Sequence, residues 1–292
     1  MSQLMDEDSR RLRGIDMALD LFRNRWTYPV LTVLSSEPLH PAQLIARINK
    51  ENASYVDLAR MRTLHEKTLF ETLRRMESQG LIACKNIAGR PGSATQRELT
   101  SMSRELLISM HRMAEWASDY RDQLTITVRE HEEPLQRNPS LANSGVAGPP
   151  SLTPEQSSWR SIGVALTILR LRWSFSVIYQ LSHGPQHPTG VAAAINARVD
   201  KNRDIMGKRT LSAKVLWDTL HRLIDAGLVN HQPRAGQFAS TAQCTLTARG
   251  YSLLGALSPI GTWATGHEEH LTATTRKRRG FIDLSAPGKF AG

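Results

Sequence analysis

The chain contains one long internal repeat, with an offset of 147 residues. Trp26 aligns with Trp173 and, without a gap, Trp116 aligns with Trp263. Between these tryptophans roughly 30 of about 91 aligned pairs are identical, which is far above chance. A long period with only two copies predicts a duplicated domain rather than a solenoid, and we expect the copies to lie across a pseudo-two-fold axis.

The length of the chain leaves room for both copies and for the segments around them. Two domains of ordinary size fit within 292 residues, each with its own core. Proline, glycine and small polar residues separate the copies, as is typical of a solvated linker. The second copy is followed by a run of basic residues, 276–279. We therefore predict a first domain at 8–124, a linker at 125–154, a second domain at 155–271 and a basic flexible tail at 272–292.

Net charge favours an anionic partner without identifying it. The formal net charge is +10, and a strongly basic protein favours a polyanion such as nucleic acid. The charge is uneven, because residues 1–130 carry 19 Lys/Arg against 17 Asp/Glu and residues 151–292 carry 17 against 8. Many basic proteins bind no polyanion, so the pattern of elements has to decide the class.

The start of the chain and its cysteines predict the compartment. The acidic N-terminus has no apolar stretch, which predicts that there is no signal peptide, and no apolar run approaches the roughly 20 residues of a membrane span. Cys84 and Cys244 occupy different positions of the repeat and lack metal-like spacing, as expected in a reducing compartment. We expect a cytoplasmic, nucleoid-associated protein with no membrane partner.

Apolar periodicity and breakers give one order of elements in each copy. In the first copy they predict helices near 15–22, 26–34, 42–48 and 64–76, a hairpin over 81–99 and a last helix capped by Thr100. Pro41 suits the start of the third helix and Gly80 the end of the fourth. The last three of these four helices, the hairpin and the long helix make a winged helix-turn-helix. The predicted class is therefore mainly α with small β-hairpin wings (α+β), in two tandem winged helix-turn-helix domains.

At this point the sequence resembles the HxlR branch of the MarR-like winged-helix regulators. The resemblance rests on Trp26-x-x-x-Val-Leu-x-x-Leu, on 211–220 followed by Gly-Leu-Val at 227–229, on Leu246-Thr-x-x-Gly, and on Trp116 and Trp263 late in the last helix. It covers both copies, about four fifths of the chain. Two features depart from the family: added residues at 51–62 and 198–209, and a poorly kept wing sequence. The resemblance implies a bacterial regulator in which one chain corresponds to the usual homodimer of single domains.

In a winged helix-turn-helix the helix before the hairpin lies in the major groove. Its outward residues are therefore the first candidates for DNA contact, since Lys and Arg suit phosphates or guanine edges and a residue at the helix start can cap the helix or touch a phosphate. The alternative is a solvated helix face. The candidates in the first copy are His65, Lys67, Thr68, Glu71 and Arg74, and those in the second copy are Ser212, Lys214, Asp218 and His221.

Four arginines outside these helices are further candidates for DNA contact. Arg62 and Arg209 stand just before the fourth helix of each copy and can follow the DNA backbone, although an ordinary polar loop is an equal alternative. Arg90 and Arg234 lie in the predicted wing tips, where arginines can enter a minor groove. Arg90 aligns with Gln237, so the two wings differ.

The sequence predicts a DNA-binding protein and no enzyme. It contains no Gly-rich phosphate loop, nucleophile elbow or paired carboxylates, and its histidines lack ligand spacing, so we expect no catalytic residues, cofactor or metal. The favoured hypothesis is a sequence-specific regulator that binds double-stranded DNA as a single-chain pseudo-dimer. The alternatives are a sequence-independent architectural DNA binder and a tandem winged-helix protein-interaction scaffold. A response to a small-molecule effector and further pairing of two chains are left open.

Overall fold

The computed structural model describes residues 2–53, 63–85, 95–132, 154–201, 210–232 and 242–278. We call residues 2–132 the first half and residues 154–278 the second half. The first half contains, in chain order, α1 (Ser2–Leu21), α2 (Thr27–Leu34), α3 (Pro41–Ala53), α4 (Glu66–Ser78), β1 (Ile82–Lys85), β2 (Gln96–Leu99), α5 (Ser101–Ser109), α6 (His111–Asp119) and α7 (Arg121–Glu132). The second half contains α8 (Pro154–Leu169), α9 (Ser174–Leu181), α10 (Pro188–Lys201), α12 (Ala213–Asp225), β3 (Val229–Gln232), β4 (Gln243–Leu246), α13 (Ala248–Gly266) and α14 (Glu268–Arg278).

The bounds of several elements recur at the offset of the sequence repeat. Helices α2 and α9, helices α4 and α12, and the strands of the two hairpins begin and end at residues 147 apart. Both hairpins are antiparallel, and Ile82 pairs with Leu99 as Val229 pairs with Leu246. Each hairpin also takes one bridge from the turn before the third helix. The small wings predicted from the sequence are therefore confirmed in both halves.

Apolar residues at helical spacing build the core. In α4 the side chains of Leu69, Leu73 and Met76 are buried, and α12 buries its counterparts. Helices α8 and α9 are also apolar. Within the described ranges no single helix has the length and apolarity to cross a membrane, and Arg160–Leu169 with Ser174–Leu181 meets that test only as a pair bent by 81°.

Several helices differ in length from the sequence prediction. The third helix begins at Pro41, as predicted, but continues beyond 48 to Ala53, because the polar residues after Ile48 include no helix breaker. Its counterpart α10 continues to Lys201. Helix α7 runs to Glu132 and α14 to Arg278, beyond the boundaries predicted at 124 and 271. The predicted single last helix is divided into α5, α6 and α7 in the first half.

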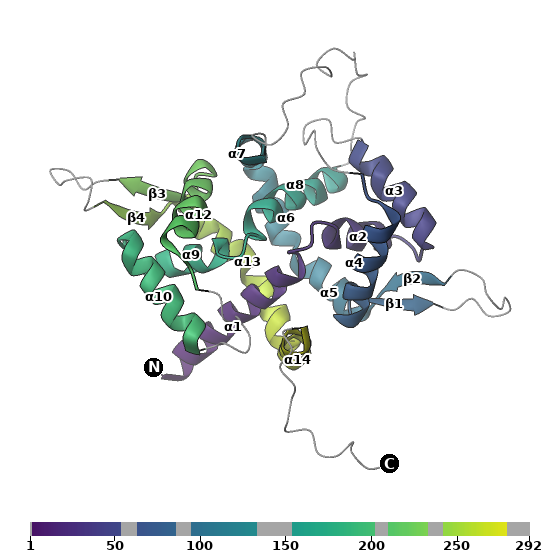
Figure 1. Ribbon diagram of the computed structural model, residues 1–292, viewed down its shortest axis with the longest axis horizontal. Helices are drawn as coiled ribbons and strands as arrows, with labels where there is room; N and C mark the ends of the chain where they lie inside the picture. The colour runs from purple at the N-terminus through teal and green to yellow at the C-terminus, as the bar shows by residue number, and fades with distance from the viewer. Residues whose placement is uncertain are drawn as a thin grey trace, which may run out of the picture.

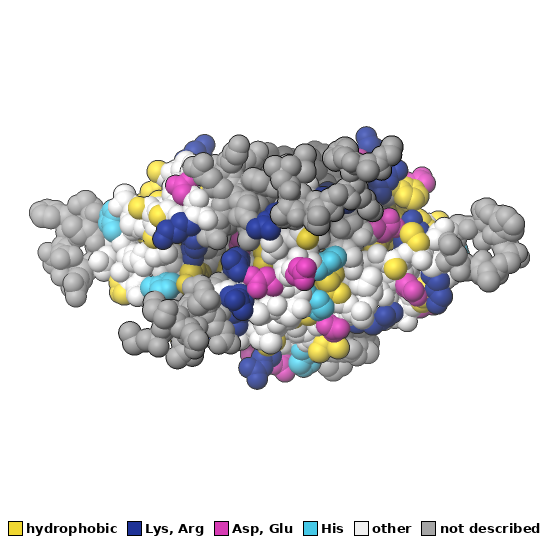
Figure 2. Space-filling view, turned by 90° about the horizontal axis from the view of Figure 1, so that it is seen from below, with side chains coloured by type: hydrophobic (Ala, Val, Ile, Leu, Met, Phe, Trp, Pro, Cys, Tyr) yellow, Lys and Arg dark blue, Asp and Glu magenta, His cyan; other side chains and the backbone are white. Residues whose placement is uncertain are grey.

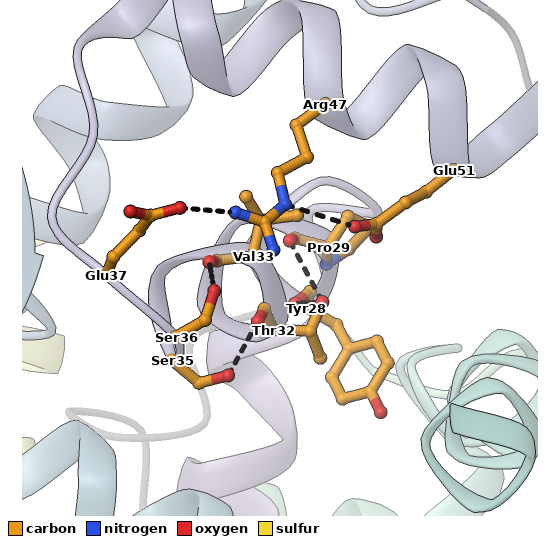
Figure 3. Close-up of polar contacts among 9 residues, drawn as sticks. All are labelled: Tyr28, Pro29, Thr32, Val33, Ser35, Ser36, Glu37, Arg47 and Glu51. Atoms are coloured by element: carbon orange, nitrogen blue, oxygen red, sulfur yellow. Dashed lines mark hydrogen bonds and ion pairs between the residues drawn. The ribbon is translucent and has the colours of Figure 1, made fainter. Parts of the chain in front are cut away.

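Polar contacts fix the turn between α2 and α3 in the first half (Figure 3). Arg47 on α3 donates to Glu37, with 2.8 Å between Nη1 and Oε1, and lies 3.6 Å from Glu51 on the next turn. Beside it, Ser35 and Ser36 donate back to carbonyls of the last turn of α2. None of the charged members recurs in the second half, where Gly184, Ala194 and Arg198 occupy those positions.

The two halves interlock through their first and last helices. Figure 1 shows the hairpins at opposite ends of the molecule, with α1, α6, α8 and α13 between them. Helix α1 packs most extensively on α13 of the second half, and α8 packs on α6 and α7 of the first half. The indole of Trp116 donates to Ser252 across this seam at 2.9 Å, and the indole of Trp263 donates to the Met102 carbonyl at 3.1 Å. The tryptophans that frame the repeat thus join the halves.

Candidate nucleic-acid interface

Helices α4 and α12 each present one buried and one exposed face. On α4 the residues Lys67, Glu71 and Arg74 are exposed, opposite the buried stripe, and Thr68 is half-buried. We call the exposed faces of α4 and α12 the first and second reading faces. The second reading face carries exposed Lys214, Asp218 and His221.

The structure gathers the predicted helix residues onto these two faces. His65 precedes α4 and Ser212 precedes α12, and both are exposed. Ser212 caps its helix by accepting from the Val215 amide at 3.4 Å, whereas His65 makes no side-chain cap. The predicted contacts at Arg62, Arg90, Arg209 and Arg234 lie outside the described residues.

An asparagine fixes the start of each reading helix. The Asn49 side chain on α3 accepts from the Leu64 amide at 2.8 Å and donates to the Leu64 carbonyl at 3.1 Å. Asn196 makes the same pair of bonds to Leu211, at 2.7 and 3.1 Å. Both bonds cross the segment that separates the third helix from the reading helix. No local sequence pattern indicates this role for the asparagines, although their identity at the 147-residue offset is a signal that points to it.

The other end of each reading helix has the glycine-terminated geometry that the sequence predicts. After α4, Gly80 has φ of +70° and its amide bonds to the Glu77 carbonyl at 3.0 Å, while the Leu81 amide bonds to Met76 at 2.9 Å. Gly227 has φ of +67° after α12, with equivalent bonds. A threonine fixes this turn in each half, since Thr100 donates to the Gly80 carbonyl and Thr247 to the Gly227 carbonyl, both at 2.7 Å. Both ends of the reading helices are therefore held alike.

Aromatic side chains distinguish the two reading faces. Phe70 on α4 is 37% exposed. Its counterpart Trp217 is half-buried and packs beside His221, with ring centroids 5.7 Å apart, and His231, at 5.2 Å. Most of the added segments, 54–62 and 202–209, lie outside the described residues. The described aromatic neighbours of the Trp217 ring are thus two histidines.

Charge alone does not locate the interface. On the face seen in Figure 2, Lys and Arg side chains are interspersed with acidic and histidine side chains rather than separated from them. Among the described residues no group of three or more His, Cys, Asp or Glu side chains lies together as a metal site. The pair of reading faces, rather than the net charge, therefore defines the candidate interface.

The two cysteines lie on the hairpins. Burial raises the pKa of Cys244 on β4 to about 11. On β1 the exposed Cys84 lies with its Sγ 3.3 Å from the Glu77 carboxylate. Desolvation and the bond to Glu77 raise the pKa of Cys84 as well, against the opposing charge of Arg97. Both thiols are thus held in their protonated form at neutral pH.

Comparison with known proteins gives one match. Residues 21–125 match the family model of the HxlR-like helix-turn-helix. The matched range spans α2 to the first turns of α7, and so includes the first reading helix and its wing. This similarity supports an HxlR-type, DNA-binding transcription regulator with double-stranded DNA as its partner. No curated protein and no solved structure matches the chain.

Proposed function

We propose that the chain is a sequence-specific transcription regulator that binds double-stranded DNA as a single-chain pseudo-dimer. Two tandem winged helix-turn-helix domains, at 8–124 and 155–271, are joined by the linker 125–154. The observation that carries the proposal is the pair of exposed reading faces, each with a lysine at the same place near the helix start, Lys67 and Lys214. A regulator of this kind acts in a bacterial cytoplasm, at the nucleoid.

The arrangement of the halves supports a pseudo-dimer. Elements recur at one offset, and a half-turn in the plane of Figure 1 brings α1 towards α8, α7 towards α14 and one hairpin towards the other. An axis along that line of sight relates α4 to α12 at the same height along the axis. A two-fold pair of reading helices suits half-sites one helical turn apart, about 34 Å.

The two reading faces favour unlike half-sites. At aligned positions Thr68 stands against Val215, and Arg74 against His221. Arginine can bind a guanine edge or a phosphate at any pH, whereas an exposed valine offers only apolar contact, such as with a thymine methyl group. The preferred site is therefore an imperfect palindrome.

Reversing the charge of each reading-face lysine tests the proposal. Lys67→Glu and Lys214→Glu each lower affinity for a specific duplex about tenfold and reduce the slope of log affinity against log salt by at least about 1, because a phosphate contact is lost. Lys67→Arg and Lys214→Arg, which keep the charge, serve as matched controls. Binding that is independent of salt contradicts the proposal.

Competition with random duplex separates this function from its alternatives. A regulator binds its specific duplex about 1,000-fold or more tightly than random DNA. An architectural binder instead releases a labelled specific duplex when unlabelled random duplex is added at a similar concentration. If neither lysine reversal affects DNA affinity, the protein-interaction scaffold becomes the better account.

A further inference from the structure

The last carbonyls of the two reading helices are satisfied from across the molecule. A helix leaves four carbonyls without partners inside it, and the glycine turn after each reading helix satisfies only part of them. The residues that bond the remaining carbonyls come partly from the final helix of the opposite half. The first half thus reaches the second reading helix, and the second half reaches the first.

At the first reading helix this contact is made by His270 of α14, which belongs to the second half. Its Nε2 lies 2.9 Å from the carbonyl of Gln79, the buried residue that ends α4. A carbonyl oxygen can only accept, so Nε2 carries the proton. The ring lies directly over the glycine turn, because a Cβ added at Gly80 would stand 2.8 Å from Nε2. Beside His270, Leu271 is buried, which fixes α14 in place.

At the second reading helix the corresponding donor is Gln123 of α7 in the first half, and it bonds a carbonyl one residue earlier in the repeat than the one His270 bonds. Its Nε2 donates to the carbonyl of Asp225, the last residue of α12, at 2.9 Å. The next carbonyl, Ala226, accepts from Arg249 at 3.0 Å, and that guanidinium lies 4.5 Å from the ring of Tyr120 in the first half. The first half therefore holds α12 directly through Gln123 and also through Tyr120.

His270 and Gln123 occupy the same position of the repeat, 147 residues apart. We propose that they are positioning residues through which each half sets the placement of the other half's reading helix. The role in DNA recognition rests on the proposed function, whereas the structural hold across the halves does not. One consequence is that an isolated half lacks the donor that ends its own reading helix.

Amide hydrogen exchange, followed by mass spectrometry on the full chain, tests the hold without DNA. His270→Ala leaves the Gln79 carbonyl without its donor, so we expect the last-turn amides of α4 to exchange roughly fivefold faster, with α12 unchanged. Gln123→Ala has the reciprocal effect on α12. His270→Gln restores protection of α4, because glutamine supplies a donor and is the residue that the first half uses at this position.

The affinity of the same variants for DNA tests the consequence for binding. Two duplexes are used, one with two copies of the half-site that α4 binds and one with two copies of the half-site that α12 binds. His270→Ala weakens binding to the half-site of α4 about fivefold more than to that of α12, and Gln123→Ala does the reverse. The proposal is overturned if each variant loosens both reading helices equally, loosens neither, or loosens the helix of its own half. If His270→Ala does not fold, Gln123→Ala and His270→Gln decide the matter by the same criteria. If no duplex binds, the proposed function fails while the exchange result still decides the hold.

Discussion

The two halves share a backbone plan and differ in the side chains that they present. Both anchor the start of the reading helix with an asparagine, Asn49 or Asn196, and end it with a glycine and a threonine. The side-chain contacts of the two helices that precede each reading helix are not shared between the halves. An Arg47–Glu37 ion pair joins α3 to the turn that precedes it, whereas in the second half the guanidinium of Arg198 on α10 lies 4.8 Å from the Tyr179 ring on α9.

This comparison separates positions that the fold constrains from positions that are free to change. The contacts that repeat involve backbone amides and carbonyls, which need a partner in any sequence. The reading faces do not repeat, because solvent can satisfy an exposed side chain whatever its type. We infer that the backbone plan positions the reading faces and that their differences carry whatever distinguishes the two half-sites. Four predictions, in order of expected effect, test this distinction.

The largest difference is expected where α13 approaches β3. A Cβ added at Gly250 would lie 2.5 Å from the Leu228 carbonyl oxygen, whereas its counterpart Ser103 carries a Cβ and donates its hydroxyl to Leu81. Gly250→Ala should lower the free energy of unfolding by about 2 kcal/mol, since overpacking outweighs the gain in helix propensity. Ser103→Ala should cost only about 1 kcal/mol. Denaturant titration measures both, and a stabilised Gly250→Ala would show that the close approach is absent.

The asparagine anchors are where the halves should behave alike. Asn49→Ala and Asn196→Ala each remove two hydrogen bonds to the residue before the reading helix, so each should lower the free energy of unfolding by about 2 kcal/mol. Asn49→Asp and Asn196→Asp, which keep only the acceptor, give an intermediate loss. Equal losses support the shared plan. A loss confined to one half would mean that only that half depends on its anchor.

Exchanging Arg74 and His221 tests whether the reading faces differ in charge. Arg74→His removes a permanent charge, and we expect the salt slope of DNA binding at pH 8 to become shallower by about 0.9. His221→Arg adds a charge at the equivalent place and should steepen the slope by a similar amount. Slopes that do not respond to either change would remove these two positions from the DNA interface.

The smallest effect concerns the cysteines, which lie on different strands of the two hairpins, Cys84 on β1 and Cys244 on β4. Because burial holds the pKa of Cys244 near 11, its thiol should resist alkylation at pH 8 until the protein unfolds. Cys84 is exposed but also has a raised pKa, so it should react about threefold or more slowly than a free cysteine. Mass spectrometry after iodoacetamide treatment measures both rates. A fast-reacting Cys84 would contradict its contact with Glu77.

Local features of the fold could be predicted from the sequence, and contacts between distant segments could not. The buried stripe of α4, the helix start at Pro41 and the cap at Thr100 depend on neighbouring residues, so periodicity and capping rules identify them. The extent of α3 was missed because polar residues can continue a helix. The contact of His270 with Gln79 joins residues that are 191 positions apart. Its existence depends on how the first and last helices cross, which no local pattern specifies.

The exposed lysines of the reading faces and the cap at Ser212 were likewise visible in the sequence, whereas His65 makes no side-chain cap. The sequence did not predict that Trp217 would pack between His221 and His231, because His231 reaches it from the hairpin. It also gave no role to the asparagine anchors, whose bonds bridge 15 residues. The exposure of the reading-face residues was thus predictable, whereas the contacts that hold their helices in place required the fold.

The most direct test of the account is selection of preferred duplexes from a random pool by the full chain. If two unlike reading faces lie in successive major grooves of one duplex, the enriched sequences should contain two related but different half-sites with centres about 10 base pairs apart. Lys67→Glu and Lys214→Glu should each erase one of the two. Enrichment of a single half-site with no fixed neighbour, or of no sequence at all, would contradict the pseudo-dimer.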